Sequence, residues 1–198
     1  MVKKLNFLSI AFMGTAFANM APEGFERFPN YYFVETGTFD GQGIRYALRA
    51  RSALNTFNEI HSVEIFKPFV DNARRNFLDQ SKVIIWYGDS ATKLWDVIKN
   101  MDKQITFWLD GHSGDSNPSI KHTPIMEELE QIKRHPIKNH TILIDDMHVI
   151  GGVLFDYLTK EDLINKIMEI NPRYVITYVA GGDEGEYPNN IMVAYVPA

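Results

Sequence analysis

Two apolar segments of the chain end in acidic residues, and these acids are the first candidates for chemistry. Phe107–Leu109 is followed by Asp110, and Ile142–Ile144 is followed by Asp145 and Asp146. An apolar strand should not end in adjacent acids unless water, hydrogen-bond donors or a cation meet them. Carboxylates from neighbouring strand ends form an all-oxygen ligand set, which suits a hard cation such as Mg²⁺. We therefore predict a metal site at Asp110, Asp145 and Asp146; the alternative is that these acids cap helices or are solvated.

Two histidines follow these acids closely in the chain. His112 comes two residues after Asp110, and His148 comes two residues after Asp146. An imidazole titrates near neutral pH, so either could accept a proton from a substrate. A loop histidine is more often only a hydrogen-bonding residue, and of the two His112 is the stronger candidate for a catalytic role beside Asp110.

A glycine-rich turn follows the first predicted strand. The segment Glu35-Thr-Gly-Thr-Phe-Asp-Gly brings Gly37, Gly41 and Gly43 into a strand-to-helix connection. Glycines let the backbone approach a ligand without a Cβ in the way. Their spacing is not the GxGxxG of dinucleotide-binding folds, so a pyrophosphate would be poorly cradled. The turn indicates a ligand without phosphate, unless it is a plain glycine-rich turn.

Further acids stand where the second and third predicted strands end. Glu64 could accept both hydroxyls of a ribose, and Asp89 could accept an adenine amino group. Ligands in open α/β sheets bind outside the carboxyl ends of the strands. Either acid alone could be a helix cap or a solvated turn residue. Glu35 and Asp110 also stand at strand ends. Four acids at the same edge of the predicted sheet favour a binding site over separate caps or turn residues.

The elements that must position these residues alternate between short strands and helices. Strands are expected at 31–35, 60–65, 83–87, 105–109, 141–144, 174–180 and 191–196. Helices are expected at 44–54, from Pro68, from 90 with Ser90 as N-cap, from Thr123-Pro124, and from the cap Thr159. Apolar strands separated by helices predict a doubly wound parallel sheet. Residues 181–190 lack a helical pattern, so the last two strands should form an antiparallel hairpin.

Composition bounds the possible classes of function. The chain has 198 residues, 45% of them hydrophobic, which suits one domain, here assigned to 21–198. It has no cysteine, which excludes disulfides and thiolate metal sites. A net charge of −5 argues against nucleic acid as a partner, although a local basic patch is not excluded.

The N-terminal segment 1–20 has the order of a secretory signal peptide. Lys3 and Lys4 precede an apolar run over 5–17, and Ala16-Phe17-Ala18 has the small-x-small pattern of a cleavage site. The run is short for a membrane span, so stable insertion is not expected. The alternative is a helical extension that packs on the domain of a cytosolic protein.

From about Phe33 to His148 the chain resembles class I S-adenosylmethionine (SAM)-dependent methyltransferase-like proteins. The motifs that carry the resemblance are Val34-Glu-Thr-Gly-Thr-Phe-Asp-Gly, Ser62-Val-Glu-Ile, Gly88-Asp-Ser, Phe107-Trp-Leu-Asp-Gly-His, Thr123-Pro-Ile with Glu128-Leu, and Ile142-Leu-Ile-Asp-Asp. The resemblance implies a Rossmann-like, mostly parallel seven-stranded sheet ending in an antiparallel hairpin. It implies SAM contacts at Glu35, Gly37, Thr38, Gly41, Glu64, Ile65, Asp89, Ser90 and Asp110.

The acids Asp110, Asp145 and Asp146 are similar to the metal triad of catechol-type and macrocin-type O-methyltransferases. The catechol type has a lysine base shortly after the fourth-strand acid, whereas Gly111, His112 and Ser113 stand there in this chain. The resemblance thus implies methyl transfer to a hydroxyl of a small molecule or sugar, assisted by Mg²⁺ or another divalent cation.

Two other functions remain open at this stage. One is a metal-dependent hydroxylase or hydrolase on the same scaffold, because a fold does not fix a function. The other is a non-catalytic exported binding protein. SAM is made and kept in the cytosol, so the cofactor predicts a cytoplasmic protein, whereas the N-terminal segment leaves export possible.

Overall fold

The computed structural model describes residues 22–50, 57–113, 121–181 and 187–197. The signal-peptide-like segment 1–20 lies outside the described residues, as do residues 114–120 after the fourth predicted strand. The C-terminal part of the first predicted helix, 51–54, is also outside them. No helix in the described part of the chain is both long enough and apolar enough to span a membrane.

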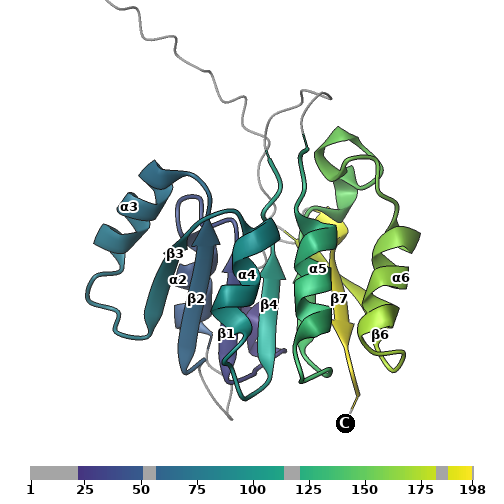
Figure 1. The fold of residues 1–198 in the computed structure, drawn as a ribbon, viewed down its shortest axis with the longest axis horizontal. Helices are drawn as coiled ribbons and strands as arrows, with labels where there is room; N and C mark the ends of the chain where they lie inside the picture. The colour runs from purple at the N-terminus through teal and green to yellow at the C-terminus, as the bar shows by residue number, and fades with distance from the viewer. Residues whose placement is uncertain (1–21, 51–56, 114–120, 182–186, 198) are drawn as a thin grey trace, which may run out of the picture.

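A seven-stranded sheet forms the centre of the molecule (Figure 1). Its strands are β1 (Tyr32–Thr36), β2 (Glu59–Glu64), β3 (Val83–Tyr87), β4 (Ile105–Leu109), β5 (Thr141–Ile144), β6 (Val175–Gly181) and β7 (Tyr187–Tyr195). Across the sheet they follow the order β3-β2-β1-β4-β5-β7-β6. The first five strands are parallel, and β7 pairs antiparallel with both β5 and β6. This arrangement confirms the predicted Rossmann-like sheet and its closing hairpin.

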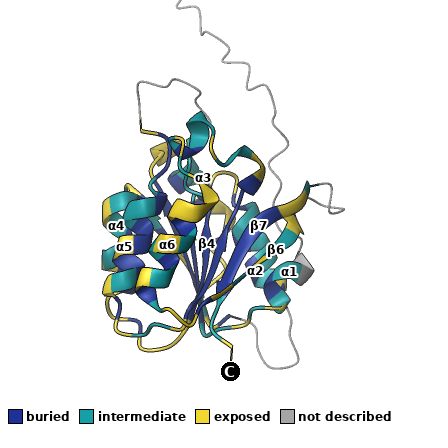
Figure 2. Cartoon of the chain, turned by 90° about the vertical axis from the view of Figure 1, so that its right-hand side faces the viewer, coloured by how far each residue is buried: buried dark blue, intermediate teal, exposed yellow. Residues whose placement is uncertain are grey.

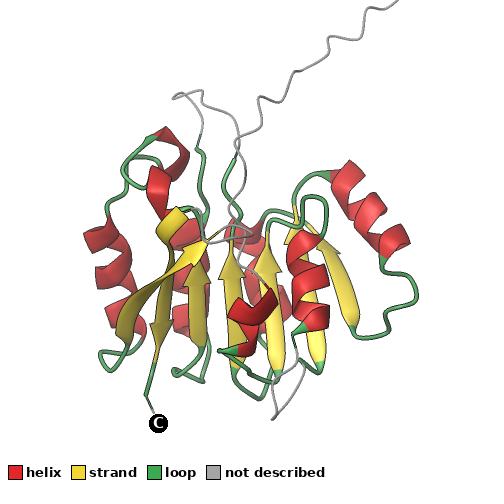
Figure 3. Ribbon diagram, turned by 180° about the vertical axis from the view of Figure 1, so that it is seen from behind, coloured by secondary structure: helices red, strands yellow, loops and turns green. Residues whose placement is uncertain are grey.

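Helices cover both faces of the sheet, which stands edge-on between them in Figure 2. One face carries α4 (Ser90–Ile98), α5 (Ile125–Arg134) and α6 (Lys160–Ile170). The other face, turned to the viewer in Figure 3, carries α1 (Pro22–Glu26), α2 (Gln42–Arg49) and α3 (Lys67–Asn76). Two short 3₁₀ helices, η1 (Met147–Val149) and η2 (Val153–Phe155), follow β5.

The central strands β4 and β5 are mostly apolar because they are buried on both faces, whereas β3 and β6 at the two edges of the sheet are partly exposed. Within β1, Phe33 joins the core beneath α1–α3, whereas its neighbour Val34 joins the core beneath α4–α6. Trp108 and Phe107 divide in the same way on β4. This alternation fixes the register of the strands, because a shift by one residue would exchange the two cores.

Of the five expected helix starts, those of α3 and α6 are confirmed. The helix expected at 44–54 is instead α2, Gln42–Arg49, and the helix expected from Thr123-Pro124 begins at Ile125 with Pro124 as its N-cap. Pro68 lies in the first turn of α3, and Thr159 caps α6 through a capping box with Asp162. Ser90 is not an N-cap: it is the first residue of α4, and the Asp89 side chain accepts the Ala91 amide at 2.9 Å. Asp89 can take this role because it keeps an extended backbone (φ −75°, ψ 121°), the usual conformation of a cap.

Candidate functional site

A cavity of about 710 Å³ opens at the edge of the sheet where the parallel strands β1–β4 end. Its wall comes from the turns after these strands and from the start of α5. The volume lies in the range of small-molecule and cofactor sites. This is the edge at which the sequence places its strand-end acids, and Glu35, Glu64, Asp89 and Asp110 all line the cavity.

Glu64, at the end of β2, is buried and held by two backbone amides. Its Oε2 accepts the Phe39 amide at 3.0 Å, and its Oε1 accepts the Phe66 amide at 2.7 Å. Phe39 has a left-handed backbone (φ 45°), a conformation that is uncommon for a bulky residue and that directs its amide to the carboxylate. Each carboxylate oxygen can accept a second hydrogen bond, so Glu64 can still receive two hydroxyls from a ligand.

Glu35, at the end of β1, is only 1% exposed although it lines the cavity. Its Oε1 accepts the Ser62 hydroxyl at 2.7 Å, and Ser62 in turn shares a short hydrogen bond with Thr38. Burial raises the pKa of Glu35 to about 8, an effect that the Ser62 hydrogen bond offsets only in part. A cationic ligand beside Glu35 would favour its charged form.

The glycines of the turn differ in what they face. A Cβ at Gly37 would stand 2.1 Å from the Asp110 carbonyl oxygen, and one at Gly43 would stand 2.2 Å from Glu35 Oε2. Both glycines line the cavity. Gly41 does not, because it packs on the ring of Phe77, where a Cβ would come within 2.7 Å. The turn therefore needs Gly37 and Gly43 next to the cavity, and Gly41 for packing against α3.

The predicted adenine side of the site is more open. Asp89 is exposed and uses one carboxylate oxygen to cap α4, whereas Ser90 is buried. Ile65 is 63% exposed and lines the cavity together with Phe66 and Phe69. The rings of Phe66 and Phe69 meet edge to face, with centroids 5.0 Å apart. Exposed apolar side chains of this kind offer a flat surface to an aromatic base.

At the ends of β4 and β5, a histidine stands between two carboxylates. His112 Nδ1 lies 3.4 Å from Asp110 Oδ1, and His112 Nε2 lies 3.1 Å from Asp146 Oδ2. Burial by itself would lower the pKa of His112, but the hydrogen bond to Asp146 and the nearby negative charges raise it above its ordinary value. Burial raises the pKa of Asp110, against the opposing charge of His112. One ligand atom from each of these three residues can be chosen so that all lie within 4.8 Å of one another.

Asp145 occupies a different position from the other two acids of the predicted triad. Its Oδ1 accepts the Asp146 amide at 2.7 Å and the Asn190 side chain at 3.2 Å. Asn190 also contacts Asp146 Oδ1 at 3.4 Å and accepts from the His148 amide at 3.0 Å. Asp145 therefore helps to orient Asp146 and Asn190, and the group of ligand atoms that lie within 4.8 Å of one another comes from Asp110, His112 and Asp146.

One buried acid near this cluster has no role in the sequence-based prediction. Glu128 lies on α5 and is 1% exposed, and its Oε1 has no hydrogen-bond partner among the described residues. A Cβ at Gly111 would come within 3.1 Å of that oxygen. Burial raises the pKa of Glu128 to about 7, and the hydroxyls of Ser90 and Thr36 offset part of the rise. The only sequence signal was its motif with Leu129, because a first-turn glutamate is otherwise an ordinary helix acid.

The connection between β4 and α5 is held at its far end by Asp156. Its carboxylate accepts the His122 amide at 2.9 Å and the Thr123 amide at 3.1 Å. Asp156 itself has a left-handed backbone, with φ 49°. The connection is therefore fixed at His122 and Thr123, where it returns to the start of α5, while residues 114–120 lie outside the described residues.

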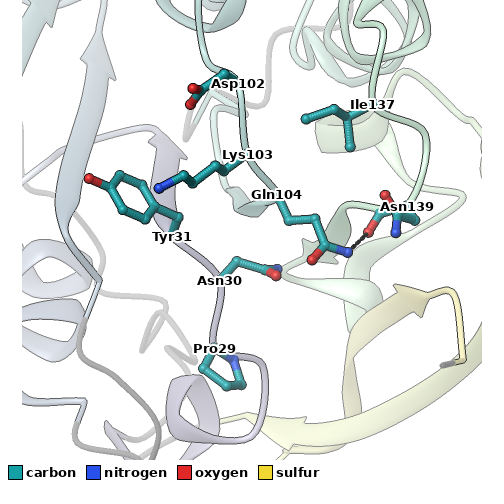
Figure 4. A pocket seen from close by; sticks show the side chains of 8 residues that line it. All are labelled: Pro29, Asn30, Tyr31, Asp102, Lys103, Gln104, Ile137 and Asn139. Atoms are coloured by element: carbon teal, nitrogen blue, oxygen red, sulfur yellow. Dashed lines mark hydrogen bonds between the residues drawn. The ribbon is translucent and has the colours of Figure 1, made fainter.

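A second hollow, of about 640 Å³, lies at the opposite edge of the sheet (Figure 4). Its polar groups already bind one another: Gln104 Nε2 donates to the Asn139 carbonyl at 2.9 Å, and the Lys103 ammonium lies 3.9 Å from the Tyr31 ring centre. Asn30 Nδ2 contacts three acceptors on β4 and β5. These contacts explain the polar lining as structural, so the strand-end cavity is the candidate site.

Comparisons with known proteins give a match at the level of the fold. No protein-family model matches the chain, and no curated protein matches it. An O-methyltransferase from Bacillus cereus in complex with S-adenosylhomocysteine (SAH) is 16% identical, with 85% of this chain and 74% of that chain covered and a TM-score of 0.53. The SAH-bound methyltransferase PaMTH1 from Podospora anserina is 12% identical, with 85% and 73% covered and a TM-score of 0.54.

The CurJ carbon methyltransferase is also similar, at 13% identity, with 88% of this chain and 51% of that chain covered and a TM-score of 0.55. At these identities the likeness establishes that the chain has the fold of SAM-dependent methyltransferases. Because the matches include both an oxygen and a carbon methyltransferase, the fold does not determine the acceptor.

Proposed function

We propose, on the premise of this methyltransferase fold, that the protein transfers the methyl group of SAM to a hydroxyl of a small molecule or sugar. One observation carries the proposal: two buried glutamates, Glu35 and Glu64, line the cavity at the ends of adjacent strands. A cavity with acidic walls suits a ligand that is a nucleoside and also a cation, and SAM is both.

The position of Glu35 favours SAM over a dinucleotide. In dinucleotide-binding folds a pyrophosphate occupies the turn after the first strand. Here that turn faces the Glu35 carboxyl, whose charged form an ammonium or sulfonium group would stabilise and phosphate oxygens would destabilise. Glu64 would hold the ribose, the Ile65–Phe69 surface would receive the adenine, and Asp89 would accept its amino group.

Methyl transfer is an in-line displacement, so positioning supplies much of the rate. The acceptor oxygen forms a bond to the methyl carbon as the carbon–sulfur bond breaks, the sulfur keeps the electron pair, and the hydroxyl proton leaves. Asp110 and His112 line the cavity and are placed to assist the loss of this proton. They could act as the base or hold a cation that lowers the pKa of the hydroxyl. The resemblance of the site to methyltransferases favours this reaction over hydrolysis or hydroxylation.

Calorimetry with SAH, SAM and NAD tests the proposal. We expect both SAH and SAM to bind and NAD to bind more weakly. Glu64→Ala should weaken SAH binding by about 1.5–3 kcal/mol, because a charge-assisted pair of hydrogen bonds is lost. Glu59→Ala, at the opposite end of the same strand, is the control and should leave SAH binding unchanged. Preference for NAD, or equal SAH affinity in wild type and Glu64→Ala, would refute the assignment.

A further inference from the structure

We propose that cofactor binding in the strand-end cavity releases one proton from Glu35, which is a neutral carboxylic acid in the free protein and a carboxylate in the complex. The ligand group that replaces the proton is the α-ammonium of SAM or SAH. This inference rests on the proposed function, because it takes SAM as the ligand. It adds a regulatory property to the site, since cofactor affinity then depends on pH.

The surroundings of Glu35 favour the neutral acid in the free protein. The residue is 1% exposed, and its Oε1 accepts a single side-chain hydroxyl, that of Ser62. In the described part of the chain, no lysine, arginine or histidine forms an ion pair with Glu35. A buried carboxylate without a cation is costly, and such a group takes up a proton instead.

The charged groups that face Glu35 from the neighbouring elements are acids. They are Asp110 after β4, Glu64 at the end of β2, and Asp40 in the turn before α2. Arg45 of α2, the nearest cation along the chain, pairs with Asp40 at 2.9 Å. Burial is the main reason that the pKa of Glu35 rises to about 8, and the three negative charges add to the rise. The free protein therefore holds a proton on Glu35 at neutral pH.

The two oxygens of the Glu35 carboxyl have different surroundings, and these place the acid proton on Oε2. Oε1 is the oxygen that accepts the Ser62 hydroxyl, at 2.7 Å. Oε2 lies beside Gly43, where a Cβ would stand 2.2 Å from it and 3.7 Å from the Trp108 ring. Glu35, Gly43 and Trp108 all line the cavity. A proton on Oε2 can thus leave by the same space that the ligand enters.

Two buried hydroxyls are arranged to hold the carboxylate after the proton has left. Ser62 donates to Glu35 Oε1, and Thr38 shares a hydrogen bond with Ser62. A hydroxyl has one hydrogen to donate, so Thr38 must be the donor to Ser62. The Ser62 hydrogen bond lowers the pKa of Glu35 but is outweighed by burial. Ser62 is therefore a positioning residue that favours the charged form without being sufficient for it.

A ligand ammonium supplies the charge that the hydroxyls cannot. As it enters, the O–H bond at Glu35 Oε2 breaks, the oxygen keeps the electron pair, and the proton passes to solvent. The ammonium then donates a charge-assisted hydrogen bond to the carboxylate. One positive charge replaces another, so no uncompensated charge is left in the buried site. A nucleoside that lacks an ammonium would leave Glu35 protonated.

Calorimetry of the full chain in buffers of different ionisation enthalpy counts the protons released on binding. At pH 6.5, SAH should release about one proton more from the wild type than from Glu35→Gln. Wild-type affinity for SAH should rise by roughly tenfold for each pH unit from pH 5.5 to pH 7, whereas the affinity of Glu35→Gln should stay constant. Glu59→Gln, at the opposite end of β2, is the matched control and should behave as the wild type.

A second ligand makes the test independent of any variant. 5′-Methylthioadenosine has the adenine and ribose of SAH but no ammonium, so its binding to the wild type should release about one proton fewer at pH 6.5. Equal proton release by the two ligands, equal release from wild type and Glu35→Gln, or a wild-type affinity for SAH that is constant with pH would overturn the coupling alone. Absence of SAH binding at every pH would instead refute the proposed function.

Discussion

Replacing Glu35 with glutamine should stabilise the free protein at alkaline pH and weaken its binding of SAM. Glutamine keeps an oxygen for the Ser62 hydroxyl, so the buried hydrogen bond survives. It removes the only charge that the side chain can carry. The other carboxylate oxygen, next to Gly43, becomes an amide nitrogen that would repel the ammonium group of the cofactor.

The expected size follows from the pKa of Glu35, which is about 8 in the folded protein and 4.5 for an ordinary glutamate. A folded-state pKa above the unfolded value stabilises the protein at low pH, and this stabilisation is lost as pH rises from 4.5 through 8. At 1.36 kcal/mol for each pKa unit, the wild type should lose about 3.5 kcal/mol from this group between pH 5 and pH 8. Glutamine does not titrate, so the variant should gain that amount relative to the wild type.

Urea unfolding at pH 5, 6, 7 and 8 measures this difference, and calorimetry with SAM measures binding. Glu161→Gln changes an exposed acid in the first turn of α6 and is the matched control. The difference in unfolding free energy between Glu161→Gln and the wild type should change little with pH. A constant free-energy difference between Glu35→Gln and wild type across this range would refute the buried-charge argument. Unchanged affinity for SAM would refute the placement of Glu35 at the cofactor.

Two further variants test a buried histidine at the opposite edge of the sheet and the close contact at Gly37. Burial lowers the pKa of His140 to about 3, so the folded protein should lose stability as pH falls from 6.5. The loss of unfolding free energy caused by His140→Asn should therefore shrink by about 2.5 kcal/mol from pH 7 to pH 4.5, as measured by urea unfolding. A loss that stays constant with pH would contradict the lowered pKa of His140. Gly37→Ala should destabilise by about 3 kcal/mol or more, because its Cβ would meet the Asp110 carbonyl at 2.1 Å. Gly151→Ala is its control, with the same φ of 84° but nothing within 4 Å, and should cost only about 1 kcal/mol in thermal melts; equal losses would show that backbone strain, and not the contact, decides.

The sequence predicts the sheet well because its central strands are buried on both faces. Short apolar runs between helical segments, such as Ile105–Leu109 and Thr141–Ile144, are typical of buried parallel strands. The predicted N-cap of α4, Ser90, is one residue late, because Asp89 and Ser90 are both good caps and only the backbone angles distinguish them. The 3₁₀ helices after β5 carry no periodic signal, so they could not be predicted.

The sequence by itself determines that acids stand at the ends of β1, β2 and β4, because parallel strands must end at one edge. It does not determine which way each side chain points after the strand ends. Asp146 has a left-handed backbone (φ 58°) that turns it toward His112, whereas Asp145 remains bound to Asn190. Glu128 reaches the same cluster only because α5 shares the hydrophobic core on that face of the sheet. These outcomes depend on contacts between distant segments, which local sequence patterns do not encode, and so only the tertiary structure decides them.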